Sequence, residues 1–545
     1  MHQSSFMTHS IQIHLMQQAF LVGDMRANAR KIIHLAHAAR DRGADLVVFP
    51  ELALCGYPPE DLLLRPGFVQ LCDESLALIQ QQVQGVDLVI GTARHDGQKL
   101  FNSAICLRDG VNRGVYDKYS LPNYAVFDEK RYFSEGSKPC VLEVKGVRIG
   151  IVICEDIWLP APPQAARQAG AQAMLVLNAS PYHSGKYAER LQILQQRHAE
   201  TQLPLFYLNL VGGQDELVFD GQSLVLDGNG QLVDRAQAFS EQELCYRLSA
   251  DGTVESHQAM AALPGEDAGI YNALVTGVRD YVGNNGFKGV VIGLSGGIDS
   301  ALTLAIAVDA LGADKVMAVM MPSRYTADIS VHDAEQQARA LGVEYKVIAI
   351  ERAFNTFNEL LAPSFAGLAA DTTEENIQAR CRGILLMALS NKLQRMVLTT
   401  GNKSEMAVGY CTLYGDMAGG FAPLKDVFKM RVYSLSRYRN TLSPVIPERV
   451  ITRPPSAELR ADQTDQDSLP AYDILDAILA MSVEQDLPRQ QIVAAGYDAA
   501  VVDQVLSLVQ INEYKRRQAP PGVRITRRAF GRDRRYPITS GYRRK

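Results

Sequence analysis

The sequence predicts an α/β protein with two domains. Short apolar runs alternate with helical patterns along almost the whole chain of 545 residues, which is typical of this fold class. The second half repeats strand, helix and strand, which indicates a doubly wound parallel sheet. The periodicity is lost between Ser256 and Gly265, where Pro264-Gly265 interrupts the chain. We therefore expect domains at residues 10–258 and 270–545, joined by a linker at 259–269.

In the first half, apolar runs predict strands, and longer stretches between them predict helices such as 27–42 and 186–201. The strands are expected at Ile11–Met16, Asp45–Pro50, Asp87–Gly91, Ser103–Leu107, Arg148–Cys154, Ala173–Asn178 and Leu205–Leu210. A hairpin-like pair follows, in which 221–227 turns at Gly228-Asn229-Gly230 and returns at 244–249.

The second half begins again with a helix and then shows the β-α-β repeat. Helices are expected at Ile270–Val282, Asp299–Leu311, Asp333–Leu341 and Asn376–Gln394. Strands are expected at Gly289–Leu294, Lys315–Met321, Tyr345–Ile350 and Arg395–Thr400.

Composition excludes several classes of function. Lys and Arg number 55 and Asp and Glu 60, so a net charge of −5 argues against a protein built mainly to bind nucleic acid or a membrane surface. No apolar run reaches the roughly 18 residues that cross a bilayer, and the start lacks the layout of a signal peptide. The eight cysteines form no C-x-x-C pair, so neither a zinc ribbon nor a disulfide framework is indicated. We expect a cytoplasmic enzyme.

A glycine-rich turn follows the predicted strand 289–294. It reads Ser295-Gly296-Gly297-Ile298-Asp299-Ser300 and precedes a helix. Adjacent glycines allow the backbone to approach a ligand closely, and Ser or Asp can cap the helix. The N–H groups of the helix N-terminus suit a phosphate. The alternative is an ordinary turn between strand and helix. The turn resembles the S-G-G-x-D-S loop of ATP pyrophosphatases, which hold pyrophosphate there.

Further polar segments stand at the predicted ends of secondary-structure elements. They are 374–380, 399–405 and the glycine-rich 414–426. In open α/β sheets such ends bind ligands, and a carboxylate such as Glu405 beside a triphosphate can hold magnesium. Each segment alone is equally consistent with a loop or a helix cap. Together they resemble the synthetase domain of NAD synthetases, in which T-G-N-K-S-E and Y-G-D-M-A-G-G-F recur.

Three reactive side chains come at the ends of predicted strands in the first half. Glu51 follows an apolar strand, Lys118 follows Val115-Tyr116-Asp117, and Cys154 ends another strand. A cation beside a thiol lowers its pKa toward the reactive thiolate. Glu51 can act as general base, Cys154 as nucleophile and Lys118 as stabiliser of an oxyanion. Buried packing for the cysteine and solvated charges for the others are the alternatives.

These segments resemble the nitrilase (carbon–nitrogen hydrolase) superfamily, whose Glu-Lys-Cys triad occurs in F-P-E, a downstream lysine and I-C-E-D. The resemblance implies an α-β-β-α sandwich for the first domain. It also implies that Tyr124, Ser180 and Lys186 bind glutamine. Many members carry a second glutamate after the lysine. Val126 occupies the position expected for it here, and Glu129 is the nearest glutamate that could take its place.

A nitrilase-like amidase in front of an ATP pyrophosphatase domain resembles the glutamine-dependent NAD synthetases, from about Ile11 to Tyr536. This resemblance implies that deamido-NAD is adenylated by ATP and that ammonia released from glutamine displaces AMP, by a shielded path, to give NAD as product. It implies an ATP site at Gly293, Leu294, Ser295, Gly296, Gly297, Ile298, Asp299, Ser300 and Thr400. Deamido-NAD would contact Asn376, Glu405 and Lys515, and magnesium would bind at Glu405. The chain would form homo-oligomers, which in such enzymes are often octamers.

Three rival functions remain at the level of sequence. One is another glutamine-fed adenylating ligase, but these use a different amidase, with a histidine triad or an N-terminal cysteine, whereas residue 2 is His2. Another is a nitrilase-type amidase with a nucleotide-sensing domain. The third is a nucleic-acid partner acting through the basic tail, where Asp533 is the only acid between Lys515 and Lys545. We expect no nucleic-acid and no membrane partner.

Overall fold

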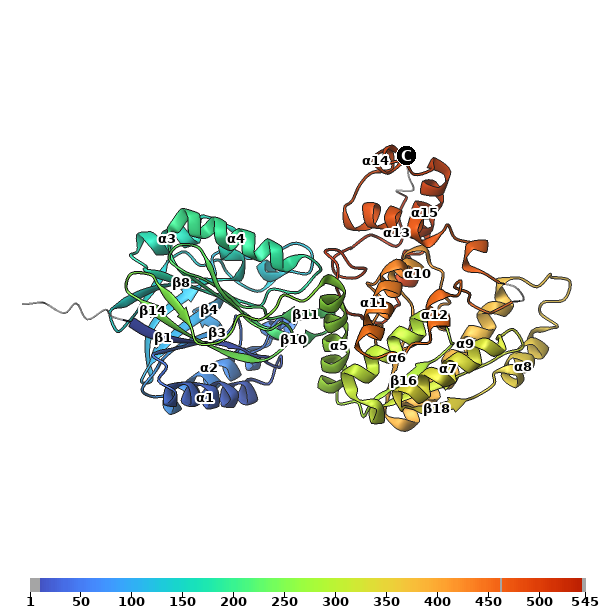
Figure 1. The fold of residues 1–545 in the computed structure, drawn as a ribbon, viewed down its shortest axis with the longest axis horizontal. Coiled ribbons are helices and arrows are strands. Elements are labelled where there is room, and N and C mark those ends of the chain that lie inside the picture. Colours follow the sequence, from blue (N-terminus) through green and yellow to red (C-terminus); the bar gives the residue numbers. More distant parts are fainter. Residues whose placement is uncertain (1–9, 461–462, 542–545) are drawn as a thin grey trace, which may run out of the picture. The chain divides into compact units, whose positions relative to one another are not determined.

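The computed structural model describes residues 10–460 and 463–541 (Figure 1). The start of the chain, for which no signal peptide is expected, lies outside these ranges. So do residues 542–545 of the predicted second domain. The chain divides into two compact units, Met1–Gln214 with Val218–Pro264 and Asp215–Leu217 with Gly265–Lys545. The division after Pro264 falls inside the linker predicted at 259–269. Within the described residues, no helix combines the length and apolar character needed to cross a membrane.

The first unit is a sandwich of two sheets with helices on both outer faces (Figure 1). A seven-stranded sheet has the order β15-β14-β1-β2-β3-β4-β5, and a six-stranded sheet has the order β13-β12-β9-β8-β7-β6. Apolar side chains that alternate along the strands, such as Ile11, Ile13 and Leu15, pack with those of the second sheet in one buried core.

The strands of this unit are β1 (Ser10–Gln17), β2 (Leu46–Val48), β3 (Asp87–Asp96), β4 (Lys99–Arg108), β5 (Val111–Asp117), β6 (Cys140–Val144), β7 (Val147–Ile153), β8 (Ala173–Asn178), β9 (Leu205–Asn209), β10 (Val211–Gln214), β11 (Leu217–Asp220), β12 (Leu224–Leu226), β13 (Leu232–Arg235), β14 (Gln242–Ser249) and β15 (Val254–Ser256). Its helices are α1 (Met25–Asp41), α2 (Pro66–Gln82), α3 (Ala161–Gln168) and α4 (Lys186–Thr201), with short 3₁₀ turns η2 (Glu129–Arg131) and η3 (Cys154–Trp158).

The α-β-β-α sandwich is confirmed, with one correction. Across the turn at Gly228-Asn229-Gly230, β12 pairs with β13 and not with 244–249. The segment 244–249 lies in β14, which pairs with β1 in the other sheet. The apolar pattern identified both strands, but pattern alone cannot choose a distant partner over a near one.

The second unit contains a four-stranded parallel sheet of order β18-β17-β16-β19, with helices packed around it. Its strands are β16 (Val290–Gly293), β17 (Val316–Met320), β18 (Glu344–Val347) and β19 (Met396–Leu398). Its helices are α5 (Glu266–Asn284), α6 (Ile298–Leu311), α7 (Asp328–Leu341), α8 (Glu351–Leu361), α9 (Thr372–Leu393), α10 (Lys403–Val408), α11 (Lys429–Leu442), α12 (Glu448–Thr452), α13 (Tyr472–Leu479), α14 (Arg489–Ala494), α15 (Ala499–Ile511) and α16 (Glu513–Arg516).

The predicted doubly wound parallel sheet is confirmed for this unit. The order 18-17-16-19 reverses direction beside β16, and ligands of open α/β sheets bind at such a switch point. Beyond the sheet, α10, α13 and α15 share a separate apolar cluster. The basic tail folds back onto its own unit, where Val523 and Ile525 are buried.

Candidate active sites

The three predicted catalytic residues of the first unit come from the ends of β2, β5 and β7. The buried Lys118 Nζ donates to Glu51 Oε1 at 2.8 Å and to both carboxylate oxygens of Glu129 at 2.9 Å. Burial lowers the pKa of Lys118, but the carboxylates of Glu129 and Glu51 outweigh it and raise that pKa well above its usual value. Lys118 is therefore a fixed cation. Glu129, the nearest glutamate after Lys118 in the sequence, is thus in direct contact with it, and its role as the second glutamate stays a prediction.

Cys154 is buried and has φ +47°, a left-handed conformation that a residue with a side chain adopts at a cost. This sharp turn ends β7 and begins η3. The expectation that the cation makes the thiol acidic is wrong for the resting site. Burial and the carboxylates of Glu51 and Glu129 outweigh Lys118 and raise the pKa of Cys154 well above its usual value. The thiol therefore needs a base that accepts its proton during attack.

Two residues that the sequence did not single out hold this cluster in place. Asn102 Nδ2 donates to Glu51 Oε1 at 2.8 Å, and the Ala179 N–H donates to Glu51 Oε2 at 2.9 Å. Asp156 accepts from the Ser120 N–H at 2.7 Å and from the Ile153 N–H at 3.1 Å. Asp156 thus joins the segment that carries Lys118 to the turn that carries Cys154.

Two of the three predicted glutamine-binding residues, Tyr124 and Lys186, contact η3, the turn that begins at Cys154. The Tyr124 hydroxyl, on a half-exposed side chain, donates to Glu155 at 3.0 Å. Lys186 Nζ lies 4.1 Å from the centre of the Trp158 ring. Burial lowers the pKa of Lys186, whereas the nearby Cys154 acts to raise it. Ser180 is buried and accepts a hydrogen bond from the Arg190 guanidinium at 3.3 Å.

Arg190 is fully buried and forms an ion pair with the buried Asp220 at 2.8 Å. Replacing Arg190 by methionine should lower the free energy of unfolding of the first unit by about 3–5 kcal/mol, because Asp220 would remain as an unpaired buried charge. Urea unfolding followed by circular dichroism measures the change. As a control, Arg131→Ala removes an exposed pair with Asp61 and should cost no more than about 1 kcal/mol. Equal losses for both variants would contradict this account.

The predicted phosphate loop lies between β16 and α6 and lines a pocket of the second unit. The Ser300 hydroxyl donates to Gly297 O at 2.9 Å and accepts from the Ser295 N–H at 3.2 Å. Gly296 has φ +81°, and a Cβ there would lie 2.3 Å from Ser330 O, so only glycine fits. The expected Ser or Asp cap is wrong, since Gly297 caps α6 without a side-chain bond. The first N–H groups of α6 therefore remain available to a ligand.

A cluster of carboxylates around one buried lysine lies beside this loop. Lys429 Nζ contacts Asp299 Oδ2 at 2.5 Å and Glu405 Oε1 at 3.4 Å. Asn402 Nδ2 donates to Asp299 Oδ1 at 2.9 Å. Burial, with Asp299 and Asp465 nearby, raises the pKa of Glu405 to about 8 against the opposing effect of Lys429. Asp465 lines the same pocket, and its buried Oδ1 has no hydrogen-bond partner.

The remaining predicted residues of this unit separate into two groups. Residues 293–300, Thr400 and Glu405 line the pocket. Asn376 of α9 and Lys515 of α16 are not among the lining residues but contact the segment 409–412. Asn376 accepts from the Thr412 hydroxyl at 2.7 Å, and Lys515 donates to Gly409 O and Cys411 O at 2.9 Å. Further charged lining residues that sequence reasoning missed are Arg382, Lys429, Arg453, Glu458 and Asp465.

Comparison with known proteins identifies both halves. The NAD synthase model matches residues 270–519 and the carbon-nitrogen hydrolase model residues 11–256. A glutamine-dependent NAD(+) synthetase of Xanthomonas campestris is 53% identical, with 99% of this chain and all of that protein covered. One of Thermotoga maritima is 44% identical, with 98% and 99% covered. The solved structure of the Acinetobacter baumannii synthetase with ADP is 48% identical, with a TM-score of 0.80 over 98% of this chain and 99% of that one.

Two sites of different chemistry on one chain define a class, the ligases that take nitrogen from an amide through a nitrilase-type amidase and use ATP to activate the acceptor. Neither half alone specifies the acceptor. The full-length matches do, and the chain belongs to the glutamine-dependent NAD(+) synthetase family.

Proposed function

We propose that this chain forms NAD from deamido-NAD, ATP and glutamine, with AMP, pyrophosphate and glutamate as the other products. One observation carries the proposal. A buried Glu-Lys-Cys cluster and a phosphate loop with adjacent carboxylates occur on a single chain. The rival ligases use a different amidase, and an amidase with a nucleotide-sensing domain would not need the carboxylates beside the loop.

In the amidase unit, Cys154 Sγ attacks the carboxamide carbon of glutamine while Glu51 accepts the thiol proton. Lys118 stabilises the negative charge that develops on the amide oxygen. Glu51 then donates the proton to the departing nitrogen, which leaves as ammonia, and water releases glutamate from the cysteine. Tyr124, Ser180 and Lys186 bind the α-amino and carboxylate ends of glutamine, and Arg190 supports this by fixing Ser180.

In the synthetase unit, the loop 293–300 and Thr400 hold ATP, and Asn376, Glu405 and Lys515 contact deamido-NAD. A carboxylate oxygen of deamido-NAD attacks the α-phosphorus, pyrophosphate leaves, and ammonia displaces AMP. Asp299 and Glu405 would hold magnesium, and the free Oδ1 of Asp465 fits a site that takes a cation. Magnesium there would neutralise charge on the phosphates. Lys429 keeps these carboxylates together in its absence.

Asp156 should matter for the amidase reaction alone. Asp156→Asn replaces one acceptor oxygen by an amide that faces N–H donors, so the Lys118 segment and the Cys154 turn lose their connection. We expect the glutamine-driven rate to fall about 10²-fold, as a displacement of about 1 Å produces. Synthesis from ammonia should be unchanged. The exposed Asp96→Asn serves as control, and an unchanged glutamine rate in Asp156→Asn would refute the positioning role.

The direct test is NAD formation from deamido-NAD, ATP and magnesium, with glutamine and ammonia supplied separately. Product with both donors supports the proposal. Product with ammonia alone would mean an inactive amidase. Glutamine hydrolysis without NAD would indicate a different acceptor and favour a rival ligase, and hydrolysis without pyrophosphate release would favour the nucleotide-sensing amidase.

Association into homo-oligomers, with an octamer as the expected size, is part of the same proposal. Helix α9 supports it, since the side chains of Ile384 and Met387 on this helix are exposed by 58% and 37%. Sedimentation of the wild type and of Ile384→Glu tests whether this face is an interface. The cytoplasmic location likewise stays a prediction.

A further inference from the structure

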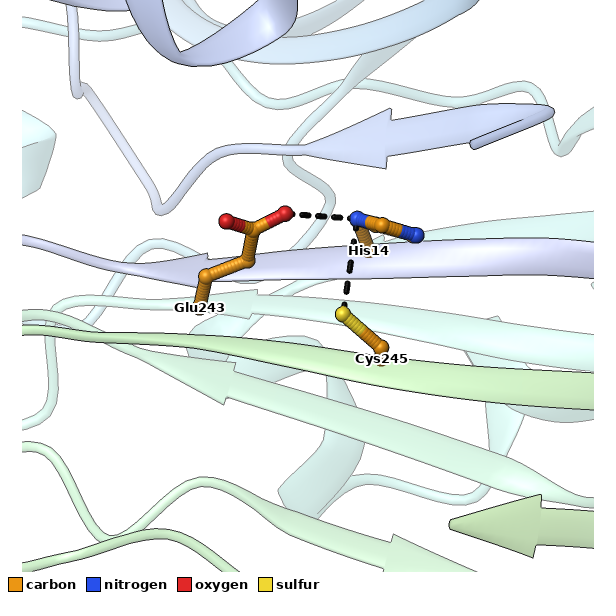
Figure 2. A group of neighbouring side chains, drawn as sticks. All are labelled: His14, Glu243 and Cys245. Atoms are coloured by element: carbon orange, nitrogen blue, oxygen red, sulfur yellow. Dashed lines mark hydrogen bonds and ion pairs between the residues drawn. The ribbon is translucent and has the colours of Figure 1, made fainter. Parts of the chain in front are cut away.

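Three metal-ligating side chains of the first unit converge outside the proposed amidase cluster (Figure 2). His14 Nδ1 lies 2.6 Å from Glu243 Oε1 and 3.5 Å from Cys245 Sγ. The three donor atoms all lie within 4.8 Å of one another. One nitrogen, one sulfur and one carboxylate oxygen thus surround a single point.

The register of the sheet creates this arrangement. Strands β1 and β14 are antiparallel neighbours in which His14 pairs with Cys245 and Met16 with Glu243. Side chains two residues apart on a strand share a face, so Cys245 and Glu243 both reach His14. Ile13 and Leu15 belong to the core between the sheets, so His14 faces the opposite side of the sheet.

Hydrogen bonds hold the three donor atoms together at this point. Burial lowers the pKa of His14, but hydrogen bonds to Cys245 and Glu243 outweigh it and raise that pKa to about 9. Glu243 has its own pKa lowered to about 2, against burial, by His14 and Arg42. Cys245 Sγ and Glu243 Oε1 thus both face His14 Nδ1, the nitrogen that would bind the metal ion.

We propose that His14, Glu243 and Cys245 form a binding site for a divalent transition metal, with zinc as the fitting ion. Imidazole, thiolate and carboxylate are the donor types that zinc takes. Bonds of about 2.0–2.3 Å at tetrahedral angles place donor atoms roughly 3.3–3.7 Å apart. The separation of 3.5 Å between His14 and Cys245 already fits. Glu243 Oε1, at 2.6 Å from His14 Nδ1 and within 4.8 Å of Cys245 Sγ, would have to move away from the imidazole and settle beside the sulfur.

The surroundings leave the site accessible. Arg42 binds the other carboxylate oxygen of Glu243, Oε2, so that Oε1 remains for the metal. His14 is buried, whereas the Glu243 side chain is 20% exposed and Cys245 is half-buried. Metal can therefore enter from the Glu243 side, and a water molecule can complete four-coordination. Bound metal would replace the His14 proton and join β1 to β14.

The test is titration of the full chain with Co²⁺, whose thiolate charge-transfer and tetrahedral d–d bands report a sulfur-containing zinc site. Cys154→Ala is the background, so that the proposed nucleophile does not contribute. We expect bands that saturate at one ion per chain, release of a proton, and displacement by Zn²⁺. Adding Cys245→Ala or His14→Asn should abolish the bands and the rise in melting temperature that Zn²⁺ causes.

Other thiols supply matched controls. Cys72 neighbours Cys55 and Cys106 neighbours Cys140, and each pair could bind a metal by itself. Cys72→Ala and Cys140→Ala should keep the bands. Absence of the bands in the background protein, their survival in Cys245→Ala, or their loss in either control would overturn the proposal. Cys245→Ala removes one partly buried thiol. The melting temperature of this variant without metal shows whether the variant is folded.

Discussion

Replacing Cys154 by alanine should reduce NAD synthesis from glutamine by at least about 10⁴-fold, the order of loss when a nucleophile is removed. Synthesis from ammonia should continue at the rate of the unaltered protein. The reason is that the alanine variant lacks the sulfur that attacks the amide, while the phosphate loop and its carboxylates lie in the other unit. NAD formation with each nitrogen source, followed separately, measures both rates.

The control for this variant is Cys140→Ala, which removes a buried thiol of β6 and should keep both activities. Circular dichroism and the melting temperature establish that both variants are folded. If ammonia-driven synthesis also disappeared from a folded Cys154→Ala protein, the division into two independent sites would be wrong.

The second large effect is expected at Asp299. Asp299→Ala should lower synthesis about 10²–10³-fold with glutamine and with ammonia alike, as for the loss of one preorganised charged contact to a transition state. The carboxylate stands in the first turn of α6, at the phosphate loop, where it meets Lys429 and Asn402. Without it, Lys429 would have only Glu405 as a close partner among its described ion pairs.

Glutamine hydrolysis by Asp299→Ala, measured as glutamate release, separates this effect from loss of the amidase. The exposed Asp314, which follows α6, is the matched control, and Asp314→Ala should leave both rates unchanged. Full ammonia-driven activity in Asp299→Ala would refute the assignment of the loop to ATP.

The strands could be predicted from the sequence wherever an apolar run ended in a clear turn signal. β1, β8 and β16 lie within a residue or two of their predicted positions. The hairpin β10–β11 was missed because Gly212 and Gly213 interrupt its apolar pattern. The helices α13 and α15 were also missed, and their apolar faces meet one another rather than the sheet. Pairing of β14 with β1 joins segments more than 200 residues apart, which local pattern does not encode.

The reactive residues of the candidate sites could be predicted from the sequence, but the residues that hold them in position could not. Glu51, Lys118 and Cys154 each follow a strand, and each lies in a short motif that is recognisable in the sequence. Asn102 and Asp156 were not found because a buried amide or carboxylate gains its role only from the partners that folding places beside it. Lys429 and Asp465 were missed for the same reason, since each is far in sequence from the phosphate loop.

The closed environment of Cys154 has a chemical consequence for the resting protein. Transfer of the thiol proton to Glu51 moves a negative charge from oxygen to sulfur and leaves the total charge beside Lys118 and Glu129 unchanged. Between turnovers the sulfur keeps its proton, because burial and these carboxylates raise the pKa of Cys154. Peroxide oxidises thiolates and exposed thiols first. The nucleophile should therefore withstand oxidative conditions that would inactivate an enzyme storing its cysteine as an exposed thiolate.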